Sequence, residues 1–112
     1  MIDSLAPNQI FVFGSNLAGN HAGGAAKQAF EQFGAVMGVG VGLRGQSYAI
    51  PTMGGKAQMW SYIDQFLDFS RHYPEYEFLL TPIGTGIAGY SLEEIAPLFA
   101  DVPSNVTKLW KK

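Results

Sequence analysis

The uneven distribution of glycine limits most strongly what this chain can fold into. Of 14 glycines in 112 residues, 11 fall between residues 14 and 55, and the other three stand between residues 84 and 89. Glycine weakens helices and strands, but it permits positive φ angles and close approach of the backbone to a ligand. Two of the glycine clusters directly follow short apolar runs. We name them the first glycine loop (residues 14–24) and the second glycine loop (residues 82–90).

Apolar runs and helical spacing predict strands that alternate with helices. Strands are expected over residues 10–13, 47–50, 78–81 and 105–110, with an extended, glycine-alternating segment over 36–45. Helices are expected over residues 25–33 and 56–73. Ser91 and Glu94 form a capping-box pattern that predicts a third helix start, and Pro97 should kink or restart that helix. Alternation of this kind predicts an α/β domain with a mostly parallel or mixed sheet flanked by helices.

Composition narrows the classes of function. The net charge is −2 with no basic stripe, which argues against a nucleic acid partner. There are no cysteines and only two histidines, so no metal site and no cofactor are expected. No apolar run approaches the ~20 residues of a membrane span, and the N-terminus does not resemble a secretory signal, so we expect a cytoplasmic protein.

The low charge leaves the oligomeric state open. Hydrophobic residues make up 47% of the chain and charged residues only 14%, against about 25% in an average domain. Either a polar, uncharged surface surrounds a monomer, or a second copy covers apolar surface in a homo-oligomer. We favour self-association.

The two glycine loops are expected to meet. Ligands of parallel α/β sheets bind beyond the carboxyl ends of the strands, and both loops run from a strand into a helix. Free amides and the partial positive charge of a helix N-terminus suit phosphate, so two such loops side by side would hold a diphosphate. The alternative is that the glycines only make tight turns.

Gly84, Gly86 and Gly89 also match the dinucleotide fingerprint G-x-G-x-x-G. That motif belongs to a unit that continues to a second strand ending in an acid about 20 residues on. The chain is ending there and carries no such acid. We therefore disfavour a Rossmann site.

The loops resemble those of a known family. Residues 82–90, PIGTGIAGY, are similar to the phosphate loop of macrodomains, which bind ADP-ribose. Residues 13–16, FGSN, followed by GGAA at 23–26, resemble the first macrodomain loop, and YAIP at 48–51 fits the strand between them. The likeness extends in outline over residues 10–99. The glycine pattern is also similar to that of small bacterial and phage proteins of unassigned function.

The resemblance implies a single macrodomain-like, three-layer αβα domain over residues 1–112 that binds ADP-ribose or a related nucleotide. The ligand-binding residues that it implies are Gly14, Ser15, Asn16, Gly23, Gly24, Gly84, Thr85, Gly86, Ile87, Ala88, Gly89 and Tyr90. Asn16 would bond a ribose, and the amides from Thr85 to Gly89 would take one phosphate. Tyr90 would pack on a ribose, or else be a core or cap-packing aromatic. Asp3 would read an adenine amino group unless it is only an exposed terminal acid.

The candidate catalytic residues are Asn16 and His21. His21 lies in the first glycine loop, where it could act near neutral pH as acid or base with Asn16, or simply face solvent. Hydrolytic macrodomains commonly carry an acid just inside the first helix, where this chain has Ala25, Ala26 and Lys27. Three hypotheses follow: a nucleotide-binding module, a hydrolase of ADP-ribosyl or nucleotide phosphate linkages, and a non-enzymatic interaction protein with structural glycine loops.

Overall fold

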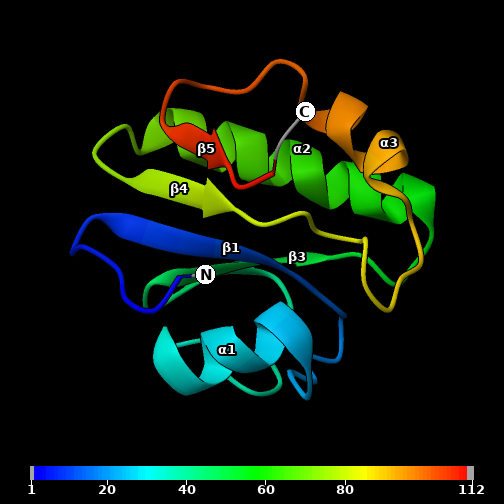
Figure 1. Cartoon of the computed structure of the whole chain (residues 1–112), viewed down its shortest axis with the longest axis horizontal. Coiled ribbons are helices and arrows are strands. Elements are labelled where there is room, and N and C mark those ends of the chain that lie inside the picture. Colours follow the sequence, from blue (N-terminus) through cyan, green and yellow to red (C-terminus); the bar gives the residue numbers. More distant parts are fainter. Residues whose placement is uncertain (1, 111–112) are drawn as a thin grey trace.

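Strand β1 lies at the centre of a mixed five-stranded sheet in the computed structural model, which describes residues 2–110 (Figure 1). The strands are β1 (Gln9–Ser15), β2 (Gly42–Arg44), β3 (Ser47–Pro51), β4 (Glu77–Leu80) and β5 (Val106–Lys108), in the order β2-β3-β1-β4-β5. β1 pairs in parallel with both β3 and β4, and β4 pairs in parallel with β5. Only β2 runs antiparallel, beside β3 at one edge.

Alternate residues of β1 build two separate cores. Ile10 and Val12 belong to the larger core, and Phe11 and Phe13 to the smaller one on the opposite face. Because successive side chains of a strand point to opposite faces, one apolar run can bury both sides of a sheet. Helices cover both faces, so the domain has three layers (Figure 1).

Helix α2 (Lys56–His72) covers the larger core with one apolar stripe. Met59, Ile63 and Phe66 are fully buried on it. The Phe66 ring meets Phe78 of β4 edge-on, with ring centroids 5.5 Å apart. This stripe repeats every three or four residues, which is the spacing of a helix that rests on a sheet.

Helix α1 (Gly24–Gln32) covers the smaller core. Its Ala29 is fully buried. Phe33 directly follows the helix, and its ring centroid lies 5.0 Å from that of Phe11. Small residues bring the helix close to the sheet, so the segment that leads into α1 lies near the end of β1.

The third helix begins at the predicted capping box and becomes a 3-10 helix near Pro97, as expected. α3 (Leu92–Ile95) carries a complete capping box between Ser91 and Glu94, and a 3-10 helix, η1 (Ala96–Phe99), follows with Pro97 in its first turn. Ile95 and Phe99 are fully buried in the larger core.

The α/β class, the mixed sheet and its flanking helices are confirmed. The expectation for residues 36–45 was only partly right, because just Gly42–Arg44 form a strand, and this strand is the antiparallel edge. Within residues 2–110, no helix is long and apolar enough to cross a membrane.

We expect Phe66→Ala to destabilise the protein by about 3–5 kcal/mol, because it leaves a cavity between α2 and β4. The measurement is the free energy of unfolding in denaturant. The adjacent exposed variant Gln65→Ala serves as the control and should change it by less than about 0.5 kcal/mol. Equal effects of the two variants would contradict the assigned core.

Candidate functional site

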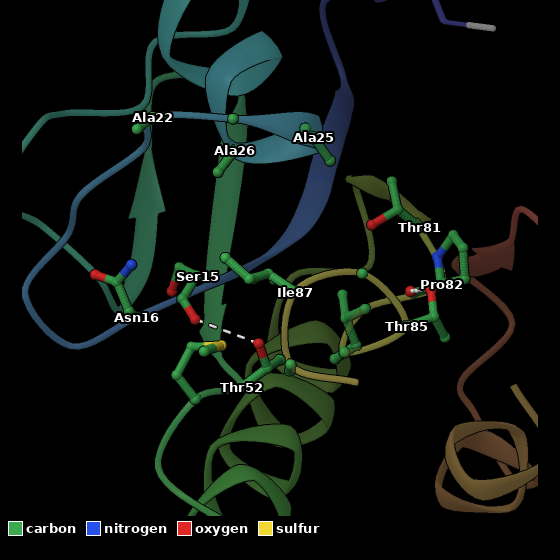
Figure 2. Close-up of a pocket in the computed structure, with 18 of the residues that line it drawn as sticks. Ser15, Asn16, Ala22, Ala25, Ala26, Thr52, Thr81, Pro82, Thr85 and Ile87 are labelled. Carbon is green, nitrogen blue, oxygen red and sulfur yellow. Dashed lines mark hydrogen bonds between the residues drawn. The ribbon is translucent and has the colours of Figure 1, made fainter. Parts of the chain in front are cut away.

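A cleft opens where β1, β3 and β4 end. Its volume is about 630 Å³. The residues that line it come from both glycine loops and from the ends of β3 and β4: Gly14, Ser15, Asn16, Asn20, Ala22, Gly23, Gly24, Ala25, Ala26, Thr52, Met53, Thr81, Pro82, Ile83, Gly84, Thr85, Gly86, Ile87 and Ala88. Figure 2 shows Ser15 and Asn16 on one side of the cleft, Thr81 and Pro82 on the other, and Ile87 between them. Parallel pairing of three strands has brought the two loops together.

The first glycine loop is held by its own side chains. The Asn16 amide donates to the carbonyl oxygen of Asn20 at 3.2 Å and accepts from the Asn20 N–H at 3.0 Å. The Ser15 hydroxyl donates to the Gly40 carbonyl oxygen. A Cβ at Gly40 would fall on the Asn16 carbonyl oxygen, so only glycine fits there. Asn16 therefore shapes the loop, as well as facing the cleft.

The N-terminus of α1 faces the cleft with its amides free. Gly23 is the N-cap and provides no side-chain cap, and the first turn carries no acid. In the part of the chain that the structure describes, the backbone N–H groups of Gly24, Ala25 and Ala26 have no acceptor. Such a terminus attracts anions through its unpaired N–H groups and the helix dipole.

The second glycine loop presents three more free amides. Turn bonds from Gly89 N–H to Gly86 O at 3.0 Å and from Tyr90 N–H to Gly84 O at 2.9 Å close the loop. Across residues 2–110, the N–H groups of Gly86, Ile87 and Ala88 find no acceptor. A Cβ at Gly86 would meet nothing within 4 Å, and the Ile87 side chain is 93% exposed. The loop is therefore open toward the cleft.

The side chains of the cleft are neutral. Among the described lining residues none is acidic, basic or a histidine. Its four hydroxyl groups all donate to backbone carbonyls: Ser15 to Gly40, Thr52 to Ser15, Thr81 to Val12 and Thr85 to Pro82. The groups in the cleft that can attract an anion are therefore backbone N–H groups.

The structure places ten of the twelve expected ligand-binding residues in the cleft lining. Gly89 and Tyr90 do not line it. Tyr90 instead packs against the larger core, where a Cβ at Gly84 would lie 3.3 Å from its ring.

His21 neither lines the cleft beside Asn16 nor faces solvent, which corrects both places expected for it. It is 1% exposed, and its ring meets Phe13 edge-on at 5.3 Å. Its Nε2–H donates to the carbonyl oxygens of Val36 and Val39, at 3.0 and 3.1 Å. Among the described residues Nδ1 has no hydrogen-bond partner. His21 therefore ties the first loop to the segment that follows α1.

The second loop leads into a capped helix terminus, as the Ser91 and Glu94 pattern predicted. The Ser91 hydroxyl accepts from the Glu94 N–H at 3.2 Å, and the Glu94 carboxylate accepts from the Ser91 N–H at 2.8 Å. The hydrogen bond from the Ser91 N–H lowers the pKa of Glu94. The positive charge of Lys56, whose Nζ lies 3.8 Å from the Glu94 carboxylate, lowers it further. Because α3 is capped by its own residues, only the loop amides are left for a ligand.

Sequence reasoning missed nine of the lining residues: Asn20, Ala22, Ala25, Ala26, Thr52, Met53, Thr81, Pro82 and Ile83. A signal was present for five of them, because residues 52–53 directly follow β3 and residues 81–83 directly follow β4, and the carboxyl ends of these strands meet at the ligand edge.

A larger groove of about 920 Å³ adjoins the cleft along α1. It shares Gly24, Ala25, Thr81 and Pro82 with the cleft, and Asp3 lies in its lining. The lining includes apolar side chains and also charged and amide side chains: Ile2, Phe11 and Leu109, with Lys27, Gln28, Glu31 and Gln32. A ligand longer than the cleft can continue into this groove.

Comparison with protein-family models, curated proteins and solved structures found no match. Within residues 2–110, no three histidine or acidic side chains gather as metal ligands. The site is therefore interpreted from its own geometry.

We expect His21→Ala to destabilise the protein by about 3 kcal/mol, because it removes a buried ring and its bonds to two carbonyls. The measurement is equilibrium unfolding in denaturant. The control is Asn20→Ala, which keeps the backbone groups that bind Asn16. An unfolding free energy unchanged by His21→Ala would contradict the structural role.

Glu94 should make stability depend on pH. Its folded pKa lies below the ordinary 4.5, so its carboxylate stabilises the fold above that pH, and the effect is lost as pH falls through the lowered pKa. The melting temperature of the wild type should therefore be higher than that of Glu94→Gln near pH 7, and the difference between the two should shrink as the pH falls. The control Glu93→Gln removes a charge from the same turn without breaking the capping box, and a gap that is constant with pH would rule out the effect.

Proposed function

We propose that this protein binds ADP-ribose or a related nucleotide diphosphate in the cleft between its two glycine loops. One observation carries the proposal: two groups of unpaired backbone amides, at the start of α1 and in the second glycine loop, line the same cleft. Each group suits one phosphate, since backbone N–H groups at a helix terminus or in a glycine turn hold anionic oxygens.

The cleft has suitable size and charge for such a ligand. Its volume of 630 Å³ falls within the ~300–1,000 Å³ of small-molecule sites. No carboxylate among the described lining residues repels an anion. A ligand held by fixed amides needs little reorganisation of the protein on binding, which supports a preformed phosphate site.

The adjoining groove offers a place for the rest of the nucleotide. Asp3 lies in its lining with the apolar Ile2 and Phe11. We propose that the base occupies this groove, where a carboxylate can accept from an amino group and apolar side chains can contact the ring. The diphosphate would then lie at Gly24 and Gly86.

We favour binding over hydrolysis. General acid–base catalysis needs a titratable group within reach of the reacting atoms. Among the described residues of the cleft there is none, and His21 is buried behind the first loop. The hydroxyl groups of the cleft already donate to carbonyls and have no base beside them.

Calorimetric titration with ADP-ribose, and with AMP and NAD for comparison, tests the proposal. We expect micromolar binding of ADP-ribose and its loss in Gly86→Glu, because the new carboxylate would enter the phosphate site. The charge-matched control Ala100→Glu, exposed and outside the cleft lining, should keep the wild-type affinity. Absence of heat with all three ligands at wild type, or equal loss in both variants, would overturn the proposal.

A further inference from the structure

Thr81 stands where the cleft and the adjoining groove meet. It lines both, together with Pro82 from the same strand end and Gly24 and Ala25 from α1. Figure 2 shows it on the side of the cleft opposite Ser15 and Asn16. A ligand that extends from the phosphate site into the groove therefore lies near this side chain.

The hydroxyl of Thr81 can only accept a hydrogen bond from such a ligand. Its single proton is donated to the Val12 carbonyl oxygen at 2.8 Å, and that carbonyl also accepts the Thr81 N–H at 3.1 Å. A hydroxyl has one proton and two lone pairs, so only lone pairs are left for a ligand. Lone pairs repel phosphate oxygens and attract O–H or N–H donors.

Thr81 is better placed for this role than the other hydroxyl residues of the cleft. Ser15 and Thr52 are each 5% exposed, so their oxygens are covered by protein. Thr85 is half-buried like Thr81, but it lies within the second glycine loop, beside the free amides that suit phosphate. Thr81 lies outside that amide cluster and has access to both cavities.

We propose that Thr81 selects ligands with a hydroxyl group next to the diphosphate, because its Oγ1 accepts a hydrogen bond from that hydroxyl. This inference rests on the proposed function and adds a substrate class to it: a phosphate-linked sugar. The phosphates of a doubly esterified diphosphate are fully ionised at neutral pH and offer no such donor, so the donor must come from the attached sugar.

Calorimetric titration with ADP-ribose tests the inference on three proteins: wild type, Thr81→Val and Thr81→Ser. Valine matches threonine in shape but has no acceptor, and Val12 keeps its bond from the residue-81 N–H. Serine keeps the hydroxyl. We expect Thr81→Val to bind about fivefold more weakly, the usual effect of one neutral hydrogen bond, and Thr81→Ser to stay within about twofold of wild type.

The outcomes separate the two proposals. If wild type binds ADP-ribose and Thr81→Val binds it equally well, the role of Thr81 is overturned and the phosphate site stands. Equal weakening in Thr81→Val and Thr81→Ser would assign the effect to packing and would also overturn the inference. If wild type does not bind, the proposed function fails and the inference with it. Far-ultraviolet circular dichroism should be used to check that each variant is folded.

Discussion

The parallel pairing of β1 with both β3 and β4 determines where everything else lies. Parallel strands end at the same edge, so the segments that follow Ser15, Pro51 and Leu80 are gathered there although they are far apart in the chain. The pairing is stable because β1 buries both of its faces, one under α1 and one under α2. The cleft is the space that the three strand ends, the start of α1 and the second glycine loop leave open.

Charged residues are scarce in the whole chain, and none lines the cleft among the described residues. A phosphate site often uses lysine or arginine, but no described lining residue carries a charge, and the donors are main-chain amides. Amides are fixed by the backbone, so their position depends on how the loops are braced. Asn16, Ser15 and the buried His21 provide that bracing for the first glycine loop through bonds to neighbouring backbone groups.

Much of the fold could be predicted from local sequence, and less of the site. The strand over residues 10–13, the α2 stripe and the Ser91 capping box were visible because periodicity and caps are local signals. The extended segment over residues 36–45 was predicted, but its antiparallel pairing over residues 42–44 was not, since strand direction depends on a turn and on partners distant in sequence. The burial of His21 was not predicted, and Tyr90 was left open between a ribose contact and a core contact, because tertiary packing decides which way a loop side chain points, here against Phe13 and the larger core.

The central claim is that backbone amides of two loops bind one anionic ligand, and amide chemical shifts test it most directly. In a ¹⁵N-labelled sample titrated with ADP-ribose, the account predicts that the largest shifts occur together in residues 23–26 and 85–88, with common saturation, while amides of the distant C-terminal end of α2 near His72 stay unchanged. Saturable shifts confined to other surfaces, or no shifts in either loop at millimolar ligand, would contradict it.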